Sequence, residues 1–104
     1  MLKIDAIKHA CAIDTTAFTA HARKRMKERN IKYENIASSV DNGEIIEQYI
    51  DDKPFPSCLI LGFSNNEPLH VVLSLNNGIL WIITTYTPTL EKWENDFKTR
   101  KVVS

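Results

Sequence analysis

Residues 69–76, LHVVLSLN, and residues 79–86, ILWIITTY, are two apolar runs separated only by Asn77 and Gly78. Both runs are dense in β-branched and aromatic side chains, which favour strands. Asn-Gly between two such runs is typical of a two-residue hairpin turn, because both residues accept a positive φ. The stretch therefore predicts an antiparallel hairpin, and with it a sheet.

The segments before this hairpin extend the sheet. Residues 44–50, EIIEQYI, and residues 57–64, SCLILGFS, have the same texture, and turn-forming DDKPFP and NNEP separate the runs. Connections this short cannot be parallel crossovers. The four runs therefore predict an antiparallel meander.

Helical patterns flank the strands. Apolar residues spaced by three and four, together with strong helix formers, predict four helices. These helices cover residues 3–13, 17–30, 33–40 and 87–100. The last, TPTLEKWENDFKTR, would place Leu90, Trp93 and Phe97 against the sheet. The expected fold is α+β, with N-terminal helices followed by a four-stranded antiparallel sheet and a C-terminal helix, in a single domain over residues 1–104.

Composition narrows the class of protein. The chain has 43% hydrophobic and 25% charged residues and a formal net charge of +0, which is typical of a soluble globular domain. The N-terminus does not have the pattern of a signal peptide, and no apolar run is long enough to span a membrane. Cys11 and Cys58 are far apart, so they are expected to be reduced thiols rather than metal ligands. We expect a cytoplasmic protein with no metal, no cofactor and no membrane partner.

Charge is unevenly distributed along the chain. Residues 21–32 contain six Lys or Arg and one acid, whereas residues 34–52 contain six acids and no Lys or Arg. This pattern predicts one basic and one acidic face. The basic face is a candidate surface for phosphate or nucleic acid.

Two arginines of the basic segment differ from its lysines. At about 100° per residue, Arg25 and Arg29 fall on or beside the apolar stripe formed by Phe18, Ala22 and Met26. An arginine that faces inward needs an acceptor, because an unpaired buried charge is very unfavourable.

Two interpretations of these arginines remain open. They could form ion pairs that hold the helix to the sheet, with carboxylates such as Glu44, Glu47 or Asp52. Alternatively, they could line a groove and bind phosphate, for which the guanidinium fork is suited. His21 lies one turn before Arg25, and a neighbouring cation keeps a histidine neutral, as a general base must be.

His70 lies on the less apolar face of its strand. With a two-residue turn at 77–78 it would lie opposite Thr85, and with a three-residue turn opposite Thr84, with Tyr86 as a diagonal neighbour. A histidine gathered with a threonine and a tyrosine can serve acid–base chemistry. The alternative is a histidine that hydrogen-bonds a hydroxyl beside the core.

Several blocks of the sequence, taken in their order along the chain, resemble those of a known family. FTAHARKRMKERNI is followed by NGEIIEQY, PFPSCLILGF, PLHVV, IITTYTP and EKW, over Phe18 to Phe97. Together they resemble domain-of-unknown-function family 4258 of small prokaryotic proteins, which looks related to the RelE/ParE-like toxins. The resemblance implies a RelE-like toxin-type domain that belongs to a type II toxin–antitoxin pair. Its partner would be a cognate antitoxin of zinc-finger or helix-turn-helix type.

For the RelE-like branch, the resemblance implies a metal-independent endoribonuclease that acts on mRNA and uses the ribosome as a further partner. The RNA 2′-OH attacks the adjacent phosphate while a base, an acid and cations assist. The resemblance assigns phosphate and RNA binding to Arg25 and Arg29, and proton transfer to His21 or His70. Tyr86 would orient or stack on a base.

A catalyst of this kind should keep His70 accessible to solvent and within reach of an inward arginine. Two alternatives share the same expected fold. One is a non-catalytic module that binds nucleic acid or protein, and the other is a ParE-like gyrase inhibitor.

Overall fold

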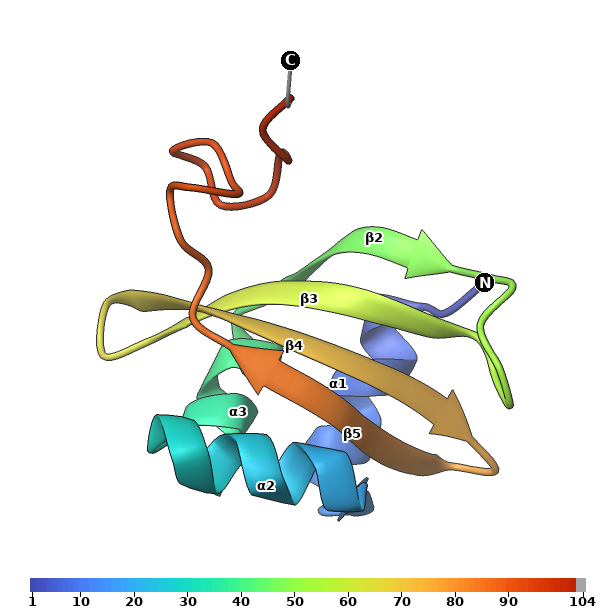
Figure 1. Ribbon diagram of the computed structural model, residues 1–104. Helices are drawn as coiled ribbons and strands as arrows, with labels where there is room; N and C mark the ends of the chain where they lie inside the picture. The colour runs from blue at the N-terminus through green and yellow to red at the C-terminus, as the bar shows by residue number, and fades with distance from the viewer. Residues whose placement is uncertain (103–104) are drawn as a thin grey trace.

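The computed structural model describes residues 1–102 and contains a five-stranded mixed sheet with three helices (Figure 1). The strand order is β1-β5-β4-β3-β2. The elements are α1 (Ile4–Ala12), β1 (Thr16–Phe18), α2 (Ala20–Arg29), α3 (Tyr33–Asp41), β2 (Glu44–Tyr49), β3 (Ser57–Ser64), β4 (Glu67–Asn76) and β5 (Ile79–Tyr86). The three N-terminal helices and the four long strands thus lie close to where the sequence predicts them, but the helix expected over residues 17–30 begins only at Ala20, and residues 17–18 belong to β1.

The hairpin between β4 and β5 is confirmed. Asn76 pairs with Ile79, so the turn consists of Asn77 and Gly78 alone. Their φ values of 52° and 75° are those that a primed two-residue turn requires.

The expectation of a four-stranded, purely antiparallel sheet is wrong. Residues 16–18 form a fifth strand that pairs in parallel with β5, through Thr16↔Leu80 and Phe18↔Ile82. A three-residue strand is too short to show an alternating pattern in the sequence. It is parallel because the whole of α2, α3 and β2–β4 lies between the two strands, which leaves ample chain for a crossover.

The expected C-terminal helix is also wrong. From Thr87 to Val102, the last residue that the structure describes, the chain is irregular apart from an isolated bridge between Trp93 and Arg100. A local turn competes with helix formation, because the Asp96 carboxylate accepts hydrogen bonds from the backbone of Lys98 and Thr99. Of the three apolar side chains expected against the sheet, only Trp93 is fully buried.

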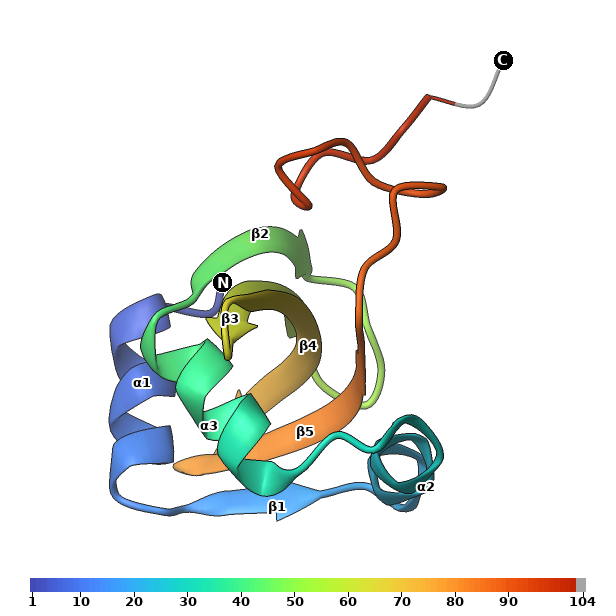
Figure 2. The same ribbon diagram turned by 90° about the vertical axis from the view of Figure 1, so that its left-hand side faces the viewer.

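The sheet has two faces that are covered differently (Figure 2). The inner face packs on the helices and forms the main hydrophobic core. Core residues from the helices and strands include Ile7, Ala10, Ala22, Ile36, Val40, Cys58, Ile60, Val71, Leu73, Leu80 and Ile82. Residues 87–102 lie on the side of the sheet opposite the helices (Figure 1) and cover the part of the outer face around His70. No helix of the described chain combines the length and apolar character needed to cross a bilayer.

Two bulges decide which side chains reach the outer face. In β5, Ile82 pairs with Leu73 but Thr84 pairs with Val72, so Ile83 is an extra residue. The bulge is held from α2, because the side chain of Thr19 donates a hydrogen bond to the carbonyl oxygen of Ile83 at 3.1 Å.

This bulge changes the position of His70 within the sheet. Despite the two-residue turn, His70 lies opposite Tyr86, and not opposite Thr85 or Thr84 as either expected register has it. The second bulge has the same effect at the other edge of the sheet. In β2 the pairing skips Ile46, which brings Glu47 opposite Leu59 on the outer face.

Candidate functional site

His70 is the centre of contact between the outer face and the C-terminal segment. Its ring is fully buried, and its Nε2 lies 2.6 Å from the carbonyl oxygen of Phe97. A carbonyl can only accept, so Nε2 carries the proton and Nδ1 accepts from the hydroxyl of Tyr86 at 3.2 Å. The Trp93 ring packs edge-on against the imidazole, with 4.5 Å between the ring centroids. His70 therefore joins β4, β5 and the C-terminal segment.

Burial keeps His70 neutral. Desolvation lowers the pKa of the imidazole, and the contact with Phe97 and the charge of Glu47 offset this only in part. Both ring nitrogens are occupied and no part of the residue is exposed. The structure thus does not give His70 the solvent access that a proton-transfer residue acting directly on RNA should have.

Two ion pairs hold the same segment at the β2 edge. Arg100 donates to both carboxylate oxygens of Glu47, at 2.8 and 3.0 Å, and its guanidinium lies 4.6 Å from the centroid of the Trp93 ring. Lys98 contacts Glu44 at 3.1 Å. The hydrogen bonds from Arg100 lower the pKa of Glu47. These carboxylates are thus partners of the C-terminal cations rather than of Arg25 or Arg29.

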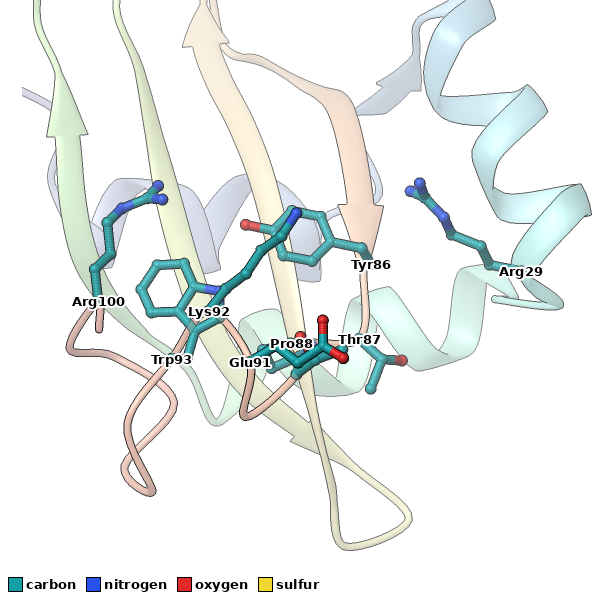
Figure 3. A pocket seen from close by; sticks show the side chains of 9 residues that line it. Arg29, Tyr86, Thr87, Pro88, Glu91, Lys92, Trp93 and Arg100 are labelled. Carbon is teal, nitrogen blue, oxygen red and sulfur yellow. The ribbon is translucent and has the colours of Figure 1, made fainter. Parts of the chain in front are cut away.

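A pocket of about 690 Å³, which we call the Tyr86 pocket, opens where the C-terminal segment leaves β5 (Figure 3). It is lined by Arg29, Tyr86, Thr87, Pro88, Thr89, Glu91, Lys92, Trp93 and Arg100. Sequence reasoning assigned Arg29 and Tyr86 to a site but missed Glu91, Lys92 and Arg100. They were missed because residues 87–100 were interpreted as a packing helix; the mixture of Trp, Lys and Arg after the TYTP block was the available signal.

Arg29 and Tyr86 lie at this pocket from different elements. In Figure 3 the guanidinium of Arg29 extends from the end of α2 towards β5, and the Tyr86 ring extends from the other side of this strand towards Trp93. Its Nη1 donates to the carbonyl oxygen of Thr85 at 2.8 Å, which fixes the group and leaves its other N–H donors for a ligand. Burial raises the pKa of the Tyr86 phenol, so this group is protonated at neutral pH.

The other two predicted residues lie elsewhere. Arg25 forms an ion pair with Glu28 on its own helix at 2.8 Å, and both side chains are partly exposed. His21 is exposed near the start of α2. Neither residue lines the Tyr86 pocket. The structure therefore brings together Arg29, Tyr86 and His70, and it leaves Arg25 and His21 outside the group.

The pocket combines groups that suit a nucleotide. Arg29 and Lys92 present cationic donors, whereas the charge of Arg100 is balanced by Glu47. The half-buried ring of Tyr86 offers an aromatic surface beside them. A cation beside an aromatic ring can bind a phosphate and stack on the attached base.

Residues 18–87 match the family described as Domain of unknown function (DUF4258), and the chain belongs to this family. Neither the curated proteins nor the solved structures gave a significant match. The matched region includes Arg29, His70 and Tyr86. The C-terminal segment that covers His70 begins at Thr87, where the matched region ends.

Proposed function

We propose that this protein binds single-stranded RNA in the Tyr86 pocket and cleaves it as a toxin-type endoribonuclease similar to RelE. The observation that carries the binding step is the convergence of the Arg29 guanidinium and the Tyr86 ring on one pocket. A guanidinium matches the geometry of phosphate, and an exposed aromatic surface stacks on any unpaired base. Folded duplexes hide their bases from such a surface, so the expected ligand is an unpaired stretch of mRNA.

The cleavage step proposed here needs no metal. The 2′-oxygen of the RNA forms a bond to the adjacent phosphorus while the bond from phosphorus to the 5′-oxygen breaks, which leaves a 2′,3′-cyclic phosphate and a 5′-hydroxyl. The carboxylate of Glu91 takes the proton from the 2′-OH, and the ammonium of Lys92 gives one to the leaving oxygen. Arg29 stabilises the charge that develops on the phosphate. His70 acts through Tyr86, whose hydroxyl it orients.

A non-catalytic RNA-binding module is the second candidate. It needs no proton-transfer residue, and the burial of His70, with both ring nitrogens hydrogen-bonded, removes one of the two histidines to which the family resemblance assigns proton transfer. For the first candidate, the toxin role would bring a cognate antitoxin as partner.

Binding is tested with fluorescein-labelled oligouridylate and the purified protein in EDTA. We expect Arg29→Ala to weaken binding and to reduce the slope of log affinity against log salt by about 0.7, the share of one phosphate contact on a single strand. Arg25→Ala is the matched control on the same helix, because Arg25 pairs with Glu28 outside the pocket. Equal effects of the two substitutions would contradict the assignment of the pocket.

Cleavage is tested on the same complexes. A product that ends in a 2′,3′-cyclic phosphate, formed in EDTA and lost in Lys92→Ala, supports the endoribonuclease. Binding that depends on Arg29 without any such product supports the non-catalytic module instead.

A further inference from the structure

A second hollow, which we call the Trp81 hollow, lies on the outer face at the opposite end of β5. It measures about 350 Å³ and is formed by side chains from β5, β4, the start of α2 and the loop before β3. Its lining is Thr19, Lys53, Pro54, Phe55, Ser74, Asn76, Trp81 and Ile83. Trp81 and Phe55 remain 36% and 44% exposed, so the hollow presents two aromatic side chains to solvent.

Helix α2 connects this hollow to the Tyr86 pocket. The helix runs beside β5 in the same direction as the strand (Figure 1). Thr19, at its N-cap, lines the Trp81 hollow, and Arg29, at its last turn, lines the Tyr86 pocket. Helix α2 therefore forms one side of both the Trp81 hollow and the Tyr86 pocket.

The two sides of the outer face differ in charge. Helix α2 carries Arg23, Lys24 and Lys27, which are exposed and form no ion pair within the described chain. On the other side, a hollow beyond Arg100 is bordered by Asp51 and Asp52. A polyanion on this face is attracted towards α2 and repelled from Asp51 and Asp52, which begin the loop whose later residues line the hollow.

The distance between the two aromatic side chains fits several nucleotides. Trp81 pairs with Ser74 and Tyr86 pairs with His70, so the bulge at Ile83 leaves both aromatic residues on the outer face. Their partners are four residues apart on β4, which corresponds to about 13 Å at ~3.3 Å per residue. A stacked strand advances about 3.4 Å per nucleotide, so the interval corresponds to about four nucleotide steps, or fewer when the strand is extended.

We infer that the RNA-binding surface extends along β5 from the Tyr86 pocket to the Trp81 hollow, with Trp81 as a second base-stacking platform and α2 as the side that contacts the phosphates. This inference rests on the proposed RNA binding and adds the length and the path of the ligand. The ligand is a single strand of several nucleotides whose bases face the sheet.

Oligouridylates of about three and about ten nucleotides test the path, because only the longer one can span both aromatic side chains. Trp81→Ala should weaken binding of the longer oligonucleotide about five- to hundredfold, the usual range for one lost stacking platform. It should leave the shorter one within about twofold, and Trp81→Phe should retain most of the affinity of the wild type. Phe63→Ala is the matched control, since Phe63 is an exposed aromatic residue of β3 that lines neither hollow.

The outcomes separate this inference from the proposed function. Equal affinity for both lengths, unchanged by Trp81→Ala, overturns the extended path and leaves the Tyr86 pocket as the RNA site. Equal weakening of both lengths by Trp81→Ala also overturns it, because the effect would then not come from added contacts. Self-association of the wild type that Trp81→Ala abolishes, with RNA affinity unchanged, assigns the hollow to a second copy of the chain. If the wild type binds neither length, both proposals fail.

Discussion

The two faces of the sheet are stabilised by different physical means. Against the inner face, three helices bury a continuous aliphatic core, in which contacts are non-directional and the contribution grows with buried area. On the outer face, the irregular segment 87–102 is held by one tryptophan, one buried histidine and two ion pairs. The comparison shows that a chain without regular secondary structure can cover a sheet when a few directional contacts fix it. It also shows why the pocket lies on the outer face, where irregular backbone leaves space between side chains.

The largest expected effect comes from opening a cavity on the inner face. Leu73 is fully buried in the aliphatic core, so Leu73→Ala should lower the free energy of unfolding by about 2–5 kcal/mol. Urea denaturation followed by circular dichroism measures the change. Phe63→Ala, at a position that is 43% exposed, should stay within about 0.5 kcal/mol of the wild type. Similar losses for both variants would contradict the assignment of the core to this face.

A smaller effect is expected from the main apolar contact of the outer face. Trp93 is 2% exposed, and Trp93→Ala should release the C-terminal segment while the sheet stays folded. The expected loss is about 1–3 kcal/mol, with faster hydrogen exchange confined to residues 87–102. Leu90→Ala, at a position that is 49% exposed, serves as the control. Equal loss of protection in β4 and β5 would mean that the outer face is part of the global core.

His70 makes the outer face sensitive to pH. Because burial lowers the pKa of this imidazole from its ordinary 6.5, the unfolded chain gains a proton that the folded chain does not as the pH falls below about 6.5. The contribution to stability is therefore complete above that pH and is lost as the pH falls from 6.5 towards the lowered pKa. Glu47 opposes the shift and Arg100 reinforces it.

Urea denaturation between pH 7.5 and 5 measures this dependence. His70→Gln should flatten the slope in this range, because it removes the imidazole whose pKa is lowered by burial. An unchanged slope in His70→Gln would assign the pH dependence to other groups.

The smallest effect is expected from the ion pairs at the β2 edge. The Arg100 side chain is 58% exposed, so its coupling to Glu47 should lie at about 0.2–1 kcal/mol despite the two-point geometry. A double-mutant cycle with Arg100→Gln and Glu47→Gln measures this coupling energy. The pair formed by Lys98 and Glu44, which is exposed on both sides, is the comparison and should give less. A coupling well above this range would place the ion pair among the main supports of the segment.

The elements that local rules determine could be predicted from the sequence. The turn at Asn77 and Gly78 needs positive φ at both positions, and the sequence supplies residues that accept it. The three N-terminal helices follow from hydrophobic period and strong helix formers, and the four long strands follow from β-branched and aromatic runs between turn-forming residues. Of the residues that the sequence predicts for a site, Arg29 and Tyr86 line one pocket.

The elements that depend on distant contacts could not be predicted. The strand at Thr16–Phe18 exists because β5 offers it a parallel partner, and three residues carry no period of their own. The stretch after β5 has a helical pattern, but His70, Glu44 and Glu47 hold it in another conformation. Arg25 faces the sheet on an ideal wheel, yet its nearest acceptor, Glu28, is on the same helix.

The extra residue at Ile83 divides β5 into two half-strands of opposite phase. Before it, even-numbered positions such as Leu80 and Ile82 are buried in the core; after it, the odd-numbered Thr85 is. A single inserted residue thus reverses which positions of the strand, odd or even, face the interior. Substitutions meant for the outer face therefore belong at positions 84 and 86, whereas simple alternation from residue 79 would select position 85, where Thr85 is fully buried.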